Sequence, residues 1–103
     1  MTAGRVRVLV YAAAPPDEPD GVSGAYHRIS ADLAGTPGLL GNELLRSLTD
    51  EHAFVVMSEW RSVEEFRRWE SGADHRRTTA PLRPYQDASR GSPFGLYQVV
   101  ADY

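Results

Sequence analysis

The stretch from His52 to His75, H-A-F-V-V-M-S-E-W-R-S-V-E-E-F-R-R-W-E-S-G-A-D-H, decides the fold of this chain. It begins with a mostly apolar run that ends on Trp60, which predicts a β-strand. Ser62 and Glu65 then stand in the S-x-x-E spacing of a capping box, which predicts that a helix starts there. The strand therefore delivers a large aromatic side chain to the start of a helix, and His75 returns close by. Such a corner can hold a flat apolar molecule and offer it a proton acceptor.

The rest of the chain adds three strands and one helix to this strand–helix unit. Residues 5–13 alternate with the period of a strand, and two more strands are predicted over 39–47 and 94–102. Apolar residues at helical spacing predict a helix over 22–33, and a further turn or two of helix is predicted within 73–84. The order β-α-β-β-α-β predicts a ferredoxin-like α+β fold, with a four-stranded antiparallel sheet and both helices on one face.

The predicted strands carry apolar side chains on both faces, although the helices can cover only one. In the third strand Phe54, Val56 and Trp60 share one face, while Val55 and Met57 share the other. A second copy of the same sheet is the simplest cover for the remaining face. We therefore predict a homodimer, in which two sheets pack face to face as a dimeric α+β barrel, with a pocket in each subunit between sheet and helices.

The length and net charge of the chain limit the number of domains and the kinds of partner to be expected. The chain has 103 residues, which suits one domain over residues 1–103. Its net charge is −3, and the eleven basic and fourteen acidic residues are interspersed, which argues against nucleic acid as a partner. The sequence has no apolar run of membrane-spanning length and no recognisable signal peptide. We therefore expect no membrane association and a cytoplasmic location.

The residue types that are absent narrow the chemistry further. Without cysteine there is neither a disulfide nor a thiolate nucleophile, and without lysine there is no Schiff-base chemistry. The acid–base groups that remain are three His, five Tyr and the carboxylates. The histidines, at positions 27, 52 and 75, form no i, i+4 pair, so no metal site is predicted.

Two consecutive motifs resemble the antibiotic biosynthesis monooxygenase superfamily. They are P-G-L-L-G-N-E-L-L-R-S from Pro37, and F-V-V-M-S-E-W-R-S-V-E-E-F-R-R-W from Phe54, followed after a short gap by His75. Members are dimeric α+β barrels, and they include small oxygenases that oxidise anthrones and related polycyclic polyketides to quinones without metal or flavin. Other members are quinol oxygenases, haem-degrading enzymes and proteins of unknown role.

The resemblance implies a cofactor-independent monooxygenase whose partners are O₂ and an aromatic polyketide or related polycyclic phenol. One alternative is a non-oxidative accessory protein, which binds a reactive polyketide intermediate and guides its cyclisation or assists a separate oxygenase. Another is a dimeric stress or signal-molecule protein of the same superfamily. The accessory protein would use the same apolar pocket as the oxygenase.

The family positions carry over in part. Trp60 matches a tryptophan that lines the substrate pocket of the anthrone-oxidising members, and Arg83 lies near a pocket arginine. Val56 and Phe66 stand where those enzymes can carry Asn and Tyr, and both replacements delete a hydrogen-bonding group. The haem-degrading members use an Asn on the first strand and a His after the second helix. This chain lacks that Asn and has Thr79 at the second position, which disfavours haem degradation.

The predicted catalytic residues are Trp60, as an aromatic platform, and His75, as the proton acceptor. For Trp60 the alternative is a plain core or dimer-contact tryptophan. For His75 the alternative is an imidazole that bonds a backbone carbonyl at a helix end. Phe66 and Trp69 share one helix face, for which core packing is the preferred interpretation.

Further residues are candidates for binding the substrate. Tyr97 or Arg83 is predicted to stabilise an anion, and solvated surface arginine or amphipathic packing are the alternatives. Asn42 and Tyr11 are candidates for a hydrogen bond to the substrate, with a bulge beside Gly41 as the other role for Asn42.

Overall fold

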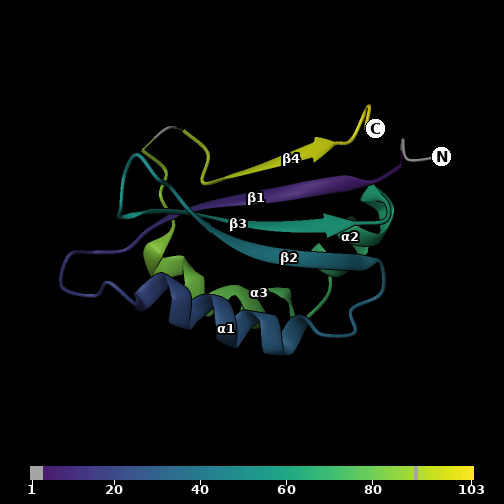
Figure 1. The fold of residues 1–103 in the computed structure, drawn as a ribbon. Helices are drawn as coiled ribbons and strands as arrows, with labels where there is room; N and C mark the ends of the chain where they lie inside the picture. The colour runs from purple at the N-terminus through teal and green to yellow at the C-terminus, as the bar shows by residue number, and fades with distance from the viewer. Residues whose placement is uncertain (1–3, 90) are drawn as a thin grey trace.

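The computed structural model describes residues 4–89 and 91–103. Figure 1 shows a twisted sheet with the helices against one of its faces. The elements are β1 (Val6–Ala13), α1 (Gly21–Leu33), β2 (Leu39–Arg46), β3 (Ala53–Trp60), α2 (Val63–Glu70), α3 (His75–Thr79), the 3₁₀ helix η1 (Ala80–Tyr85) and β4 (Phe94–Gln98). The predicted β-α-β-β-α-β order is confirmed, with α3 and η1 as the additional helical turns.

The strands are antiparallel and lie in the order β2-β3-β1-β4. Val6 faces Trp60 and Val10 faces Val56, so these side chains share one side of the sheet. That side packs against the helices and is called the inner face below; the opposite side is the outer face. The register shifts between Leu39 and Gly41, where a β-bulge had been one interpretation of the sequence.

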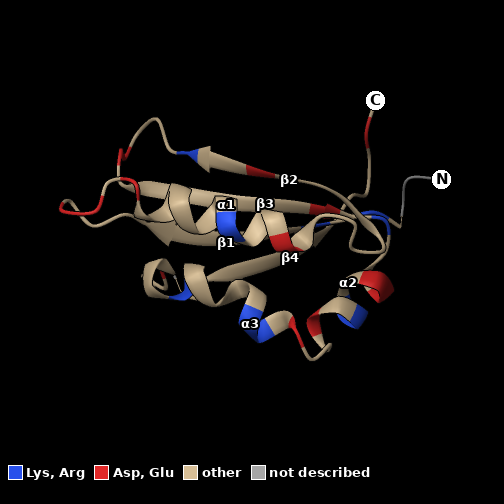
Figure 2. Cartoon of the chain, turned by 90° about the horizontal axis from the view of Figure 1, so that it is seen from below, with Lys and Arg blue, Asp and Glu red and all other residues tan. Residues whose placement is uncertain are grey.

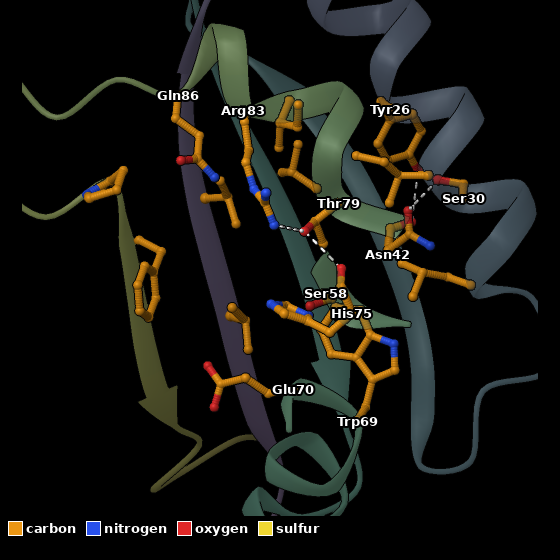
Figure 3. A pocket seen from close by; sticks show the side chains of 18 of the residues that line it. Tyr26, Ser30, Asn42, Ser58, Trp69, Glu70, His75, Thr79, Arg83 and Gln86 are labelled. Carbon is orange, nitrogen blue, oxygen red and sulfur yellow. Dashed lines mark hydrogen bonds between the residues drawn. The ribbon is translucent and has the colours of Figure 1, made fainter. Parts of the chain in front are cut away.

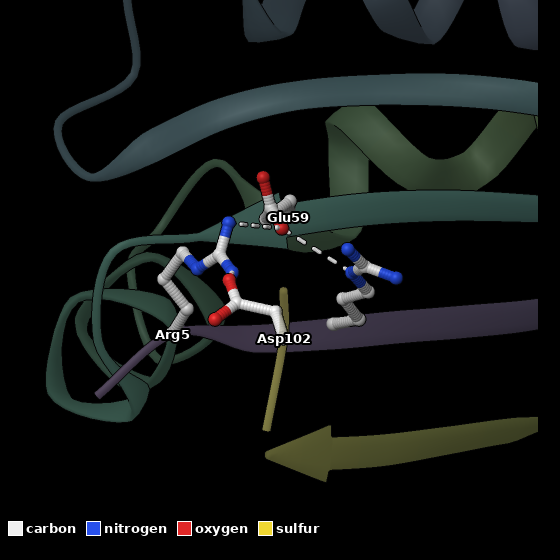
Figure 4. Close-up of polar contacts among 4 residues, drawn as sticks. Arg5, Glu59 and Asp102 are labelled. Carbon is white, nitrogen blue, oxygen red and sulfur yellow. Dashed lines mark hydrogen bonds and ion pairs between the residues drawn. The ribbon is translucent and has the colours of Figure 1, made fainter. Parts of the chain in front are cut away.

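The last strand is shorter than predicted. β4 ends at Gln98, which faces Val6, the first residue of β1, and one more backbone hydrogen bond runs from Val99 N to Arg5 O at 2.9 Å. Beyond this point the chain turns toward Arg5, whose guanidinium pairs with Asp102 and Glu59 (Figure 4). The predicted continuation of the strand to Asp102 is therefore wrong, since no residue of β1 remains opposite it.

The start of α2 shows why the chain turns sharply after β3. Ser62 is the N-cap, and its hydroxyl accepts a hydrogen bond from the Glu65 amide at 3.2 Å. Arg61 donates to both carboxylate oxygens of Glu65, at 2.9 and 2.6 Å. These hydrogen bonds lower the pKa of Glu65 to about 2, so its charge persists in moderately acidic solution. The predicted helix start at Ser62 is confirmed.

Two tightly packed groups of side chains hold the layers together. One joins α1 and η1 to β1, and it contains Val22 and Ala25, both fully buried. The other joins α2 to the sheet, and it contains Trp60 and Phe66, which are 1% and 3% exposed. Leu39 and Trp69 pack against both groups, and the candidate site lies beside them, between the sheet and the helices.

Gly38→Ala is expected to destabilise the protein more than Gly35→Ala. Both glycines have positive φ, 86° and 82°, so each change costs about 1–2 kcal/mol of backbone strain. A Cβ on Gly38 would also lie 2.6 Å from the Cβ of Glu65, whereas one on Gly35 would meet nothing within 4 Å. That overlap adds about 1–3 kcal/mol, measurable as the difference between the variants in urea unfolding. Equal unfolding free energies would show that Glu65 yields without cost.

The outer face keeps an apolar centre. Leu9 and Tyr11 of β1 lie beside Met57 and Val55 of β3, and all four are partly exposed. On the edge strand β2, Leu45 is 43% exposed. This surface is the one on which a homodimer is predicted, and the homodimer stays a prediction.

Charged residues of both signs lie along the helices (Figure 2). Neighbouring residues form ion pairs there, such as Arg67–Glu70 and Arg77–Asp74, each at 2.9 Å. No helix in the described part of the chain is both long and apolar enough to cross a membrane.

Candidate active site

A cavity of about 250 Å³ lies between the inner face of the sheet and the helices. Its wall takes side chains from all four strands and from α1, α2, α3 and η1 (Figure 3). The volume is close to the lower end for ligand pockets, which is roughly 300 Å³. The predicted pocket between sheet and helices is therefore present within one chain.

His75 is the basic group at the centre of this wall. It opens α3, and its ring meets the ring of Trp69 edge to face, with centroids 4.5 Å apart. Its Nδ1 is buried, and no residue in the described part of the chain forms a hydrogen bond with it. The alternative of an imidazole bonded to a backbone carbonyl is thus not what the structure contains. Burial lowers the pKa of His75 below its usual 6.5, Glu70 opposes that shift, and Arg83 and Arg76 add to it.

Two charged side chains lie on either side of His75, as Figure 3 shows. Arg83 projects from η1 and donates to the carbonyl of Arg76 at 3.0 Å and to the Thr79 hydroxyl at 3.4 Å. Glu70 is at the end of α2 and pairs with Arg67. Both line the cavity, so an anion formed there would meet a guanidinium and a protonated imidazole would meet a carboxylate.

A polar group occupies another part of the wall, where α1 approaches β2. The Ser30 hydroxyl donates to Oδ1 of Asn42 at 3.1 Å, and the Tyr26 hydroxyl donates to the main-chain oxygen of Asn42 at 3.2 Å. All three residues line the cavity. Ile29 and Leu33 on the same helix are apolar, whereas Ser58, which faces Asn42 across the β2–β3 pair, is polar.

The prediction for Trp60 needs a correction. Trp60 is buried beneath α2, does not line the cavity, and donates from Nε1 to the Ser58 hydroxyl at 2.9 Å. The tryptophan that lines the cavity is Trp69, for which core packing had been preferred. Trp60 is kept from the cavity because it is the last residue of β3, where α2 crosses the inner face. Phe66 and Trp69 of α2 therefore cover its ring.

The predictions for Tyr97 and Tyr11 also need a correction. Tyr97 faces Arg7 across the β4–β1 pair, and it is 54% exposed on the outer face. Tyr11 shares that face with Leu9, and neither tyrosine lines the cavity. Successive side chains of a strand alternate between the faces, so odd-numbered positions of β1 and β4 point away from the cavity.

Five predicted site residues do line the cavity: His75, Arg83, Phe66, Val56 and Asn42. Their roles toward a substrate stay predictions. The sequence analysis missed several other residues of the wall, namely Trp69, Tyr26, Ser30, Glu70 and Thr79. One signal was available, because the first helix carries Tyr26 and Ser30 four residues apart, on the same face as its apolar positions.

The described residues contain no cluster of side chains of the kind that holds a metal ion. Across residues 4–89 and 91–103, His, Cys, Asp and Glu side chains gather in no group of three or more. What the cavity offers instead is an apolar wall, a neutral imidazole, one cation, one carboxylate and an amide–hydroxyl pair.

Comparison with known proteins places the chain in a family. The family model described as antibiotic biosynthesis monooxygenase matches residues 5–81. Protein SchA of Streptomyces halstedii is 29% identical over 98 residues, which make up 95% of this chain. A mycobilin-producing haem oxygenase of Mycobacterium tuberculosis is 39% identical over 46 residues, covering 45% of this chain and 43% of its own.

The chain spans only 26% of the length of SchA. Among solved structures, SnoaB, a cofactor-independent oxygenase from Streptomyces nogalater, superposes with a TM-score of 0.76 at 22% identity, covering 97% of both chains. That likeness shows a shared fold. With three quarters of its residues inside the family model, the chain belongs to the antibiotic biosynthesis monooxygenase family.

Proposed function

We propose that this protein is a monooxygenase that oxidises an aromatic polyketide or a related polycyclic phenol with O₂, without metal or flavin. The observation that carries the proposal is His75, a partly buried imidazole set edge-on to Trp69 in an apolar cavity, whose buried Nδ1 has no partner among the described residues. A neutral base next to a flat apolar wall suits a substrate that must lose a proton before it reacts. Membership of the family and the fold shared with SnoaB support it.

The reaction asks little of the protein. Direct reaction of triplet O₂ with a closed-shell molecule is spin-forbidden, but a carbanion or phenolate can give O₂ one electron. His75 removes the proton whose loss creates this anion. Electron transfer from the anion to O₂ gives a substrate radical and superoxide, which recombine, and the product is protonated to a hydroperoxide. Loss of water then breaks the O–O bond and the second C–H bond and leaves a carbonyl. The sum is CH₂ + O₂ → C=O + H₂O, so no outside reductant is consumed.

The other residues of the wall bind and orient the substrate. The Trp69 ring is available for offset stacking, and Val56 and Phe66 supply apolar contact. Arg83 stabilises the anion, while Glu70 stabilises the imidazolium that forms on His75. The apolar side chains of the wall reduce the contact of water with the reactive intermediates.

A homodimer joined through the outer faces of two sheets forms part of the proposal. Its support is the partly exposed apolar group around Leu9, Tyr11, Val55 and Met57. The organisation as one domain and the cytoplasmic location likewise stay predictions, as does the lack of nucleic-acid and membrane partners. Light scattering of the purified protein tests the dimer, and a monomer at micromolar concentration would contradict it.

The second candidate is an accessory protein that binds a polyketide intermediate without oxidising it. The observation that favours it is the chemistry of Val56 and Phe66, which line the cavity at positions where the resemblance implies Asn and Tyr. With neither group present, the cavity has fewer donors to stabilise a developing charge.

Oxygen consumption distinguishes the two candidates. The purified protein is given anthrone in aerated buffer with a chelator and no flavin, and O₂ uptake and anthraquinone formation are followed against the spontaneous rate. We expect uptake well above that rate and equimolar with product. Tight binding of anthrone without uptake would favour the accessory protein, and absence of both binding and uptake would contradict both candidates.

The acid limit of activity is expected below pH 6.5. Only the neutral imidazole can accept a proton, and burial lowers the pKa of His75 from 6.5, so activity persists as the pH falls through that value and is lost below it. Glu70→Gln removes the carboxylate that raises this pKa, so its acid limit should lie lower still. Profiles of kcat/KM against pH for both proteins check this. A limit above 6.5, or an upward shift in the variant, would contradict it.

A further inference from the structure

We infer that Ser30 and Asn42 form a subsite that binds a phenolic hydroxyl on the end of the ligand farthest from Arg83. The inference rests on the proposed function for what happens to the ligand, but it concerns binding alone. It assigns a binding role to Ser30, which the proposed mechanism does not use. It also narrows the substrate class to ring systems that carry an oxygen substituent at the end near Ser30 and Asn42.

The strand order shows that the cavity extends across the whole sheet, with Ser30 and Asn42 at one end. Asn42 is on β2 and Phe94 is on β4, and these strands are the two edges of the sheet. Both residues line the same cavity, which therefore crosses the sheet from one edge to the other, about 14 Å at the spacing of neighbouring strands. Figure 3 shows Ser30 and Asn42 on one side and Arg83 on the other. A ligand that lies across the sheet can touch both.

One hydrogen bond orients the side-chain amide of Asn42. Ser30 donates to its Oδ1 at 3.1 Å, and Tyr26, one turn earlier on α1, donates to its main-chain oxygen at 3.2 Å. The other end of this amide is the Nδ2 atom of Asn42. Within residues 4–89 and 91–103 it has no protein acceptor, so its two N–H donors remain available.

The same geometry leaves an acceptor beside that donor. The Ser30 oxygen has used its hydrogen toward Asn42, but it retains lone pairs. A phenolic hydroxyl can donate to this oxygen and accept from Nδ2 at the same time. A ring that carries only hydrogen at that position would leave both groups unsatisfied, which costs affinity.

Stability alone gives little reason for these polar side chains. Asn is disfavoured in strands, and Ile29 and Leu33, which line the wall from the same helix as Ser30, are apolar, although the residue that faces Asn42 on β3 is Ser58. Replacing a hydrogen-bonded pair by apolar groups of similar shape can be nearly neutral for folding. Recognition of a ligand oxygen requires a polar group in the wall with an unused donor, and the Asn42 amide supplies one.

The test compares two probes that cannot be turned over: 2-hydroxyanthraquinone, with its hydroxyl protonated, and anthraquinone. Their dissociation constants are measured by quenching of tryptophan fluorescence with the wild type, Asn42→Leu and Ser30→Ala. We expect the wild type to prefer the hydroxylated probe about tenfold, which is within the range for two hydrogen bonds. Both variants should bring this ratio near one and leave anthraquinone binding almost unchanged.

Two further variants serve as controls. Ser30→Thr keeps the hydroxyl and should keep the preference, and Ser23→Ala changes a serine of α1 that does not line the cavity. Ser30→Ala favours helix formation, so it carries the test if Asn42→Leu fails to fold. A wild-type ratio near one, or a preference that survives Ser30→Ala and the folded Asn42→Leu, would overturn the inference.

Failure of the proposed function is distinguishable from failure of this inference. If anthrone oxidation is absent while the hydroxyl preference depends on Ser30 and Asn42, the subsite stands without the oxygenase. If oxidation occurs and the preference is missing, the subsite is refuted while the oxygenase stands.

Discussion

Replacing His75 by Ala is expected to lower the turnover of anthrone by about 10²–10⁴-fold, the usual contribution of a general base. The loss should appear in kcat, because the Trp69 ring and the apolar wall that bind the substrate remain. The dissociation constant of anthraquinone for the variant should therefore change little. Rates of O₂ uptake at saturating substrate, together with that dissociation constant, check the prediction.

A matched control comes from the other histidines. His27 is exposed on α1 and lies outside the cavity, so His27→Ala should retain full activity. Added imidazole should restore part of the turnover of His75→Ala, since a free base can enter the space that the side chain leaves. Undiminished turnover in His75→Ala would remove this residue from the mechanism. A loss confined to KM would assign it to binding alone.

Trp60→Ala is expected to destabilise the protein by about 3–5 kcal/mol, the range for removing a large buried aromatic side chain. Trp60 is 1% exposed, and its ring contacts those of Phe66 and Trp69, with centroids 5.5 and 5.3 Å away. The change also removes its hydrogen bond to Ser58. Because domains of this size are stable by only about 5–15 kcal/mol, the variant should unfold at much lower urea concentration.

Trp69→Leu provides the contrast, because Trp69 lines the cavity while Trp60 does not. We expect Trp69→Leu to weaken binding of anthraquinone more than it weakens folding. Trp60→Phe, which keeps an aromatic ring in the core, should cost less stability than Trp60→Ala and leave the affinity intact. If Trp60→Ala folded with normal stability and lost only affinity, Trp60 would be a wall of the site after all.

Much of the fold follows from local patterns. The alternation in β1, the helical spacing in α1 and the cap at Ser62 each depend on residues close together in the chain, and all agree with the structure. The end of β4 could not be predicted in this way. It depends on where β1 begins, a residue more than ninety positions away in the chain, because a strand ends where its partner ends.

For the candidate site, too, local patterns predicted some features and tertiary packing decided the others. Periodicity put Val56 and Trp60 on one face of a strand, but only the crossing of α2 over that face buries Trp60 and leaves Trp69 at the cavity. The partnership of Ser30 with Asn42 was equally out of reach, since it depends on how closely α1 packs on β2.

Neighbours in the chain thus determined the elements, their order and the positions of the aromatic and basic side chains that could form a site. Only tertiary packing decided which of them border empty space. Hydrogen bonding within helices and backbone alternation within strands act over a few residues, whereas a cavity exists where side chains from distant segments fail to fill the volume between two layers.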